Sequence, residues 1–192
     1  MIAIVQYNAG NTGSVQNALA RLGCESIVTD DSNELLKADK VIFPGVGEAR
    51  SAMSFLREKG LDVVLRSLNQ PLLGICLGLQ LMCSYSEEGE TACLGVFPNR
   101  ISRFVKPEIV PHVGWNNVSY REDRLFKEIP QDTDFYFVHS FFADLSEDTA
   151  AVCNYGESFS AALARDNFYA VQFHPEKSAA MGQQILKNFL AL

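Results

Sequence analysis

One segment indicates the fold class: Pro71-Leu-Leu-Gly-Ile-Cys-Leu-Gly-Leu-Gln-Leu-Met-Cys-Ser84. Residues 71–75 form a short apolar run that predicts a buried strand, and residues 77–84 predict a helix. A buried strand that passes directly into a helix is the repeating unit of an α/β domain. Two glycines flank Cys76 at the point where the predicted strand ends.

The same alternation of strand and helix fills the first half of the chain. Predicted strands cover residues 2–7, 26–29 and 40–44. Predicted helices, with apolar side chains at helical spacing, cover residues 14–22, 48–58 and 61–68. Strands and helices that alternate in this way form βαβ units with right-handed crossovers, so a mostly parallel sheet covered by helices is expected.

The second half of the chain has a different pattern. Consecutive β-like runs follow one another with little helix between them. They cover residues 95–105, 112–118, 134–140, 150–154, 160–164 and 168–173, and residues 181–190 predict a final helix. We therefore expect a single α/β domain over residues 1–192, with antiparallel strands added to one side of a three-layer open sheet.

Composition and charge exclude several classes of function. The net charge is −7 and the sequence has no cluster of Lys and Arg, which argues against nucleic acid and an anionic membrane as main ligands. No signal peptide is expected, and no run approaches the roughly 18 apolar residues of a membrane span. Five cysteines without CxxC or zinc-type spacing predict reduced thiols in a cytoplasmic protein.

Cys76 differs from the other four cysteines in its surroundings. Gly74-Ile-Cys-Leu-Gly78 is the sulfur counterpart of the G-x-S-x-G elbow, a strand-to-helix turn that leaves no room for side chains beside the nucleophile. The turn would place the thiol at a helix N-terminus, where the dipole and free N–H groups favour the thiolate. The Leu77 N–H could then donate to an oxyanion. A structural cysteine in a glycine-rich turn is the alternative interpretation.

Val171-Gln-Phe-His-Pro-Glu176 supplies the groups that Cys76 lacks. A histidine at the carboxyl end of a strand projects toward the crevice where open α/β sheets bind ligands. Pro175 ends the strand, and Glu176 could bend back to hold the second nitrogen of His174. Together they form the set of nucleophile, base and orienting carboxylate that covalent acyl transfer requires.

Three segments resemble the motifs of the class I (triad-type) glutamine amidotransferases, in the order and at the spacing of that family. They are Pro44-Gly-Val-Gly47, Gly74-Ile-Cys-Leu-Gly-Leu-Gln80 and Gln172-Phe-His-Pro-Glu176. The resemblance spans nearly the whole chain and implies a flavodoxin-like fold. It also implies hydrolysis of glutamine to glutamate and ammonia by a triad of Cys76, His174 and Glu176, through a thioester on Cys76.

Further segments are similar to the branch of this family that serves histidine biosynthesis. They are Tyr7-Asn-Ala-Gly-Asn11, Pro111-His-Val-Gly-Trp-Asn116, Tyr136-Phe-Val-His-Ser140 and Lys177-Ser178. Tyr7 and Val113 depart from the branch, where an acidic residue and a methionine are common. The resemblance implies a heterodimer with a (β/α)₈-barrel cyclase, which would use channelled ammonia to make imidazole glycerol phosphate and an aminoimidazole carboxamide ribotide.

The resemblance also implies roles for residues outside the triad. The oxyanion would be held by Leu77 and by the segment Gly45, Val46 and Gly47, after a peptide flip that the glycines make inexpensive. Glutamine would be held by Gln80, Glu88, Ser140 and Phe141. The partner interface would include Asn8, Asn11, Trp115, Asn116, Tyr136 and Lys177. No metal and no cofactor are implied, and His112 and His139 are expected to be structural or interface residues.

For several of these residues, a structural role without a part in binding or catalysis stays open at this point. Gln80 could be a solvated helix residue, Glu88 an ordinary loop acid, and Gly45 with Gly47 a plain turn. Three other functions also remain open. They are a glutaminase that serves anthranilate or pyridoxal phosphate synthesis, a non-catalytic regulatory relative, and a cysteine-dependent hydrolase of another substrate.

Overall fold

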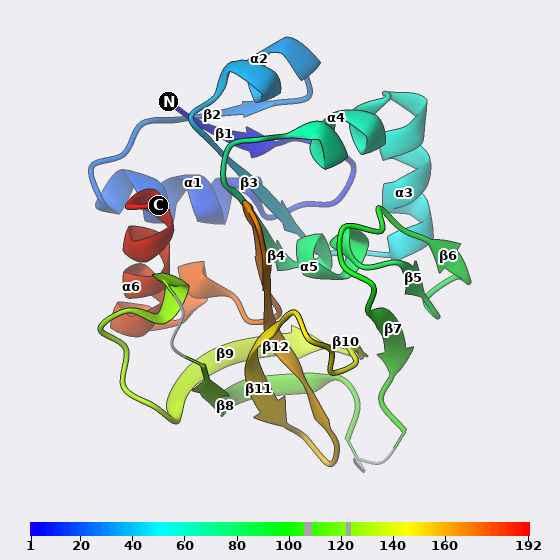
Figure 1. The fold of residues 1–192 in the computed structure, drawn as a ribbon, viewed down its shortest axis with the longest axis vertical. Coiled ribbons are helices and arrows are strands. Elements are labelled where there is room, and N and C mark those ends of the chain that lie inside the picture. Colours follow the sequence, from blue (N-terminus) through cyan, green and yellow to red (C-terminus); the bar gives the residue numbers. More distant parts are fainter. Residues whose placement is uncertain (106–108, 122–123) are drawn as a thin grey trace.

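The computed structural model describes residues 1–105, 109–121 and 124–192. Parallel strands form the centre of its sheet (Figure 1). In spatial order they are β2 (Ser26–Thr29), β1 (Ile2–Val5), β3 (Lys40–Gly45), β4 (Leu72–Cys76) and β13 (Phe168–Val171). All residues of β1 and β4 are buried, because helices cover the sheet on both faces.

Two groups of helices complete the three layers. One face is covered by α1 (Thr12–Arg21) and α6 (Ala179–Leu190), which lie together at the left of Figure 1. The other face is covered by α2 (Ser32–Lys37), α3 (Ala49–Glu58), α4 (Leu61–Ser67) and α5 (Leu77–Met82). Apolar side chains at helical spacing form each contact with the sheet, as Val15 and Leu19 do on α1. The predicted three-layer α/β fold is confirmed.

Strands that are antiparallel except for the β5–β7 pair extend the sheet on the β13 side, as predicted. The path continues through β12 (Ser158–Arg165), β10 (Phe141–Ala143), β7 (Arg100–Arg103), β5 (Tyr85–Ser86) and β6 (Thr91–Ala92). A branch leaves β12 through β11 (Thr149–Asn154) to the pair β8 (His112–Tyr120) and β9 (Thr133–His139). Two short 3₁₀ turns, η1 (Arg124–Phe126) and η2 (Pro175–Lys177), complete the elements of the described residues.

One local prediction was wrong and one helix was missed, each for a physical reason. The run 95–105 is a strand only at Arg100–Arg103. The N–H groups of Leu94, Gly95 and Phe97 instead bond to carbonyls at the end of α5, so this segment caps the helix. Helix α2 was missed because one buried residue, Leu35, carries no periodicity. Its signal was the N-cap Asp31, whose carboxylate accepts the N–H groups of residues 33 and 34.

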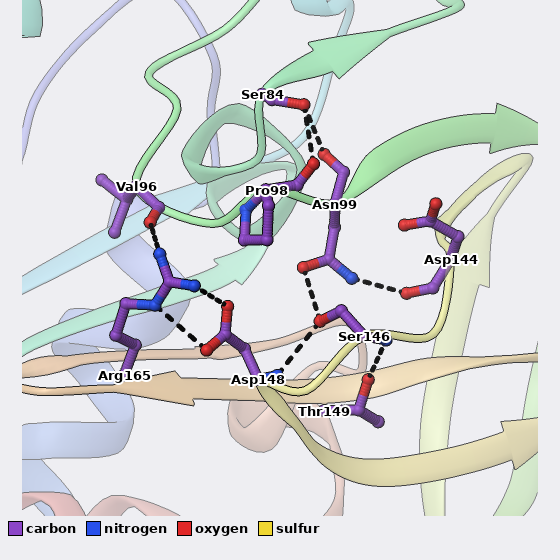
Figure 2. Close-up of polar contacts among 9 residues, drawn as sticks. All are labelled: Ser84, Val96, Pro98, Asn99, Asp144, Ser146, Asp148, Thr149 and Arg165. Atoms are coloured by element: carbon purple, nitrogen blue, oxygen red, sulfur yellow. Dashed lines mark hydrogen bonds and ion pairs between the residues drawn. The ribbon is translucent and has the colours of Figure 1, made fainter.

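A polar network ties this capping segment to the antiparallel half of the molecule (Figure 2). The Arg165 guanidinium binds the Asp148 carboxylate at 2.6 Å and the Val96 carbonyl at 3.1 Å. The Asn99 amide donates to the Asp144 carbonyl at 2.6 Å and accepts from the Ser146 hydroxyl at 3.0 Å. The network holds the segment that follows α5, and it therefore supports the helix that starts at Cys76.

No helix of the described residues is both long and apolar enough to span a bilayer. The same residues contain no group of His, Cys, Asp and Glu side chains arranged to hold a metal ion.

Candidate active site

Cys76 lies in a strained turn at the carboxyl end of β4. Its backbone has φ 53° and ψ −106°, a conformation that costs an L-residue about 1–3 kcal/mol. The two flanking glycines are required by close contacts. A Cβ on Gly78 would lie 1.8 Å from the Phe43 carbonyl oxygen, and one on Gly74 would lie 2.6 Å from the Met82 sulfur. The predicted elbow is therefore present, with α5 packed directly against β3.

Gly78→Ala is expected to destabilise the domain by about 3 kcal/mol, because the added methyl group meets backbone that is part of a central strand. Gly13→Ala is the matched control, since nothing lies within 4 Å of a Cβ at this exposed position of α1. It should stabilise by roughly 0.5 kcal/mol. Urea denaturation of both variants measures the difference. Equal midpoints would contradict the close contact between α5 and β3.

His174 and Glu176 form a buried pair beyond the end of β13. The His174 Nδ1 lies 2.8 Å from the Glu176 Oε1, and neither side chain is accessible to solvent. The amide of Asn11 donates to the same carboxylate oxygen at 2.5 Å. Asn11 precedes α1 with φ 88°, so its backbone turns the amide away from a capping role and toward Glu176. The sequence did not reveal that Asn11 binds the His174–Glu176 pair.

The pKa values of His174 and Glu176 depend on each other. Burial lowers the pKa of His174, but hydrogen bonding to Cys76 and Glu176 and their negative charges outweigh it and raise the pKa to about 10. Burial raises the pKa of Glu176, and the bond and charge of His174, with the Asn11 amide, lower it below the usual value. The His174 Nε2 is buried and has no bond of ordinary geometry to a described residue. Since Glu176 occupies Nδ1, Nε2 is the nitrogen left to exchange a proton with Cys76, whose charge raises the pKa of His174.

A cavity of about 270 Å³ opens over Cys76. It brings together most of the residues predicted to hold glutamine or its oxyanion. Its lining is Val46, Gly47, Cys76, Leu77, Gln80, Glu88, Val138, His139, Ser140 and Phe141. A larger hollow of about 640 Å³ lies at the amino ends of β1 and β2, where Met1 and Ser26 line it. That end of the sheet is opposite to Cys76, so the smaller cavity is the candidate active site.

Two side chains predicted to hold glutamine, Gln80 and Glu88, already form hydrogen bonds within the chain. Gln80 is only 5% exposed, and its amide donates to the Phe141 carbonyl at 3.0 Å and to the Gln172 oxygen at 3.1 Å. It is therefore not a solvated helix residue. The Glu88 carboxylate accepts the Ala49 N–H at 2.8 Å, and its partial burial raises its pKa.

The glycines of the predicted oxyanion segment have separate reasons to lack side chains. Gly47 has φ 136°, which favours glycine. At Gly45, which is paired with Cys76 across β3 and β4, a Cβ would lie 1.9 Å from the Tyr7 hydroxyl. That hydroxyl is buried without a hydrogen-bond partner among the described residues. Burial and the charge of Cys76 raise the pKa of Tyr7, so its hydroxyl stays neutral.

The residues predicted at a partner interface fall into two groups. Trp115 and Tyr136 are cross-strand neighbours on β8 and β9 with ring centres 6.1 Å apart, and the Lys177 ammonium lies 5.9 Å from the Tyr136 ring. The three asparagines have amides that bond within the chain. Asn8 binds Ser51, Asn11 binds Glu176, and Asn116 binds His112 and Asn154.

Comparison with known proteins agrees with this geometry. The family model "Glutamine amidotransferase class-I" matches residues 3–192. The chain is 54% identical to imidazole glycerol phosphate synthase subunit HisH of Bacteroides fragilis, over 100% of this chain and 99% of that protein. It is 46% identical to subunit HisH 2 of Legionella pneumophila, over 100% of this chain and 98% of the relative.

Solved structures share the fold at low sequence identity. A structure described as a glutamine amidotransferase has a TM-score of 0.77 and 20% identity, over 100% of this chain and 98% of the other. PurLQS from Thermotoga maritima has a TM-score of 0.71 and 16% identity, over 99% of this chain and 97% of the other. The chain belongs to the class I glutamine amidotransferase family.

Proposed function

We propose that this chain is the glutaminase subunit of an imidazole glycerol phosphate synthase, with residues 1–192 as one amidotransferase domain. The observation that carries the proposal is the strained Cys76 elbow, which lines the cavity, together with the buried His174–Glu176 pair, whose histidine interacts with Cys76. Full-length relatives of 46–54% identity bear the name of this subunit. We place the protein in the cytoplasm, and its proposed site uses no metal or cofactor.

The reaction begins with attack of the Cys76 thiolate on the carboxamide carbon of glutamine. The raised pKa of His174 keeps the imidazole protonated, so it can give a proton to the departing ammonia. This leaves a glutamyl thioester on Cys76 and a neutral imidazole. His174 then takes a proton from water, whose oxygen attacks the thioester carbon, and glutamate leaves as the thiolate returns. Glu176 keeps the ring oriented in both steps.

The remaining groups of the cavity position the substrate and its developing charge. The N–H groups of Leu77 and Val46 stabilise the oxyanion, Val46 after rotation of its peptide bond. Gln80 holds the amino-acid end of glutamine, and Glu88 pairs with its ammonium group. Ser140 and Phe141 line the same cavity and would contact glutamine largely through their backbone.

The ammonia must reach its acceptor without meeting bulk water, which would protonate it near neutral pH. We therefore propose a tightly docked (β/α)₈-barrel cyclase subunit. The exposed face of β8 suits such a partner, because Val113 and Trp115 are 55% and 54% exposed and lie on the same side of the strand. Tyr136 and Lys177 adjoin Trp115, and aromatic side chains commonly anchor interfaces. Asn8, Asn11 and Asn116 would join this interface, with the Asn11 bond to Glu176 and the Asn116 bond to His112 kept.

The test is to mix the chain with the cyclase and its phosphoribulosyl formimino nucleotide, and to compare glutamate with imidazole glycerol phosphate. Equal yields are expected, with glutaminase turnover well above that of the isolated chain, because the oxyanion segment is completed by docking. Glutamate formation at the same rate with and without the cyclase would contradict the proposed partner.

Trp115→Ala is the variant that tests the docking face. It should weaken the affinity for the cyclase by a factor of about 30, the effect of losing one central aromatic anchor. Leu36→Ala is the control, because Leu36 is equally exposed but lies on α2. Equal affinity of the two variants, measured by calorimetry, would place the interface elsewhere.

A further inference from the structure

A line of hydrogen bonds joins strand β8 to the glutamine cavity through two buried histidines that lie outside the triad. The Asn116 amide nitrogen lies 3.3 Å from the His112 Nε2. The His112 Nδ1 lies 3.0 Å from the His139 Nε2. The His139 Nδ1 lies 2.7 Å from the Phe141 carbonyl oxygen. His139 and Phe141 both line the cavity over Cys76.

The line continues along the cavity wall to the nucleophile. The Phe141 carbonyl also accepts a bond from the Gln80 amide at 3.0 Å. That amide donates to the Gln172 oxygen at 3.1 Å, and the Gln172 nitrogen lies 3.6 Å from the Cys76 sulfur. The position of the Phe141 carbonyl therefore affects the Gln80 amide in the cavity wall and, through Gln172, the Cys76 thiol.

The direction of every bond in the line is fixed by chemistry. A carbonyl oxygen only accepts, so the His139 Nδ1 must carry the proton, and the Nε2 of a neutral ring must accept. The His112 Nδ1 must then donate, which leaves its Nε2 to accept from Asn116. The Asn116 amide is oriented by two further bonds. Its oxygen accepts the Asn117 N–H at 2.9 Å, and its nitrogen donates to the Asn154 carbonyl at 3.0 Å.

Aromatic packing keeps both rings neutral and dry. His112 stacks on Tyr155 and Phe137, with ring centres 4.0 Å and 4.9 Å away. His139 lies against Phe104 and Phe159 at 5.3 Å and 5.2 Å. Burial lowers the pKa of His112 to about 4 and that of His139 to about 3. Both rings must then be the Nδ1–H tautomer, which free imidazole side chains disfavour in water.

We propose that Asn116, His112 and His139 are positioning residues that act as a relay, fixing the Phe141 carbonyl and the Gln80 amide for glutamine binding. The inference rests on the proposed glutaminase function. None of the three touches the reacting atoms, so the relay sets KM more than kcat. It also makes glutamine binding sensitive to a residue of β8, the strand proposed to face the partner.

The two amide substitutes for histidine separate the relay from simple packing. In His139→Asn the amide nitrogen replaces Nδ1 and can still donate to the Phe141 carbonyl, whereas His139→Gln places its amide at the Nε2 position. At saturating cyclase, KM for glutamine should rise about threefold in His139→Asn, which keeps the bond to Phe141 but loses the bond to His112, and about tenfold in His139→Gln, with kcat nearly unchanged in both. If His139 only filled space, the longer glutamine side chain would replace it better than asparagine does. Equal KM values in the two variants, or the reverse order, would therefore overturn the relay.

The outer end of the relay has its own matched pair. Asn116→Ala removes the terminal donor and should raise KM about threefold. Asn33→Ala removes the same group from an exposed position of α2, away from β8 and from the cavity. It should leave KM unchanged. Equal KM values in these two variants would show that Asn116 is outside the relay.

Nitrogen-15 spectra of the full chain give a readout that needs no activity. Both His112 and His139 should appear as Nδ1–H tautomers at neutral pH, and Asn116→Ala should shift the Nε2 resonance of His112. An Nε2–H tautomer or an imidazolium at either ring would overturn the relay even if all variants fold. If both rings of the wild type are Nδ1–H tautomers but the protein does not hydrolyse glutamine, the proposed function fails and the relay geometry stands.

Discussion

Cys76→Ala is expected to abolish glutamine hydrolysis while the domain stays folded. Removing the nucleophile of a covalent mechanism costs on the order of 10⁵-fold or more in kcat, because no other group can form the acyl intermediate. None of the other four cysteines lines the cavity over Cys76. Glutamate release, measured in the complex with the cyclase and its nucleotide, gives the effect. A wild-type glutamyl thioester should be trapped on acid quenching and should be absent from the variant.

Cys153→Ala is the matched control for Cys76→Ala. Cys153 is also a buried thiol, but it lies in β11, away from the triad. Both variants should lose about 1 kcal/mol of unfolding free energy or less, as small core truncations do. Only Cys76→Ala should lose activity. Retained glutamate release in Cys76→Ala would refute the nucleophile, and a comparable loss in Cys153→Ala would mean that activity reports stability.

The sequence predicted those parts of the site that are local. The elbow is contained in residues 74–78, and the His174–Glu176 pair spans three residues, so each motif carries its own geometric reason. The flanking glycines at 74 and 78 do meet the close contacts that the motif requires. The layered α/β fold was also predictable, because buried parallel strands and amphipathic helices have distinct periods.

Contacts between distant segments were not predictable in the same way. Periodicity tells which side of a strand or helix a residue faces, but it does not tell which side chain it meets there. Asn11 binds Glu176 across 165 positions, and His112 meets His139 only because β8 and β9 pair in the register that places them opposite. Tyr7 looked like a departure from the family pattern. In the fold its hydroxyl fills the space that Gly45 leaves empty.

Very short elements escaped for another reason. Strands β5 and β6 have two residues each and β10 has three, which is too few to show an alternation. Yet β10 begins at Phe141, whose carbonyl joins Gln80 to His139. The part of the site that positions substrate therefore lies where the sequence pattern is weakest.

Glu176→Gln is expected to lower kcat/KM by about 10³- to 10⁴-fold, the cost of neutralising the carboxylate that orients a catalytic histidine. The amide keeps the size of the side chain, but it removes the negative charge that helps to raise the pKa of His174. Turnover, measured in the complex with the cyclase, should show this loss. Its alkaline limit should also move from near pH 10 toward the ordinary histidine value, because His174 must be protonated when ammonia leaves.

The same charge pair predicts how the free energy of unfolding depends on pH. The folded pKa of His174 lies above its unfolded value of 6.5, so its contribution is complete below pH 6.5 and is lost as pH rises toward about 10. The folded pKa of Glu176 lies below its unfolded value of 4.5, so its contribution is complete above pH 4.5 and is lost at lower pH. The wild type should therefore exceed Glu176→Gln in stability most clearly between pH 4.5 and 6.5.

Glu147→Gln separates this effect from the loss of one negative charge. Both substitutions change the net charge from −7 to −6, but Glu147 lies in the exposed loop between β10 and β11. Its melting temperature should follow that of the wild type at every pH, whereas the difference for Glu176→Gln should shrink on both sides of the window. A difference that stays constant from pH 4 to pH 10 would mean that Glu176 stabilises by packing, and His174 would then need another source for its raised pKa.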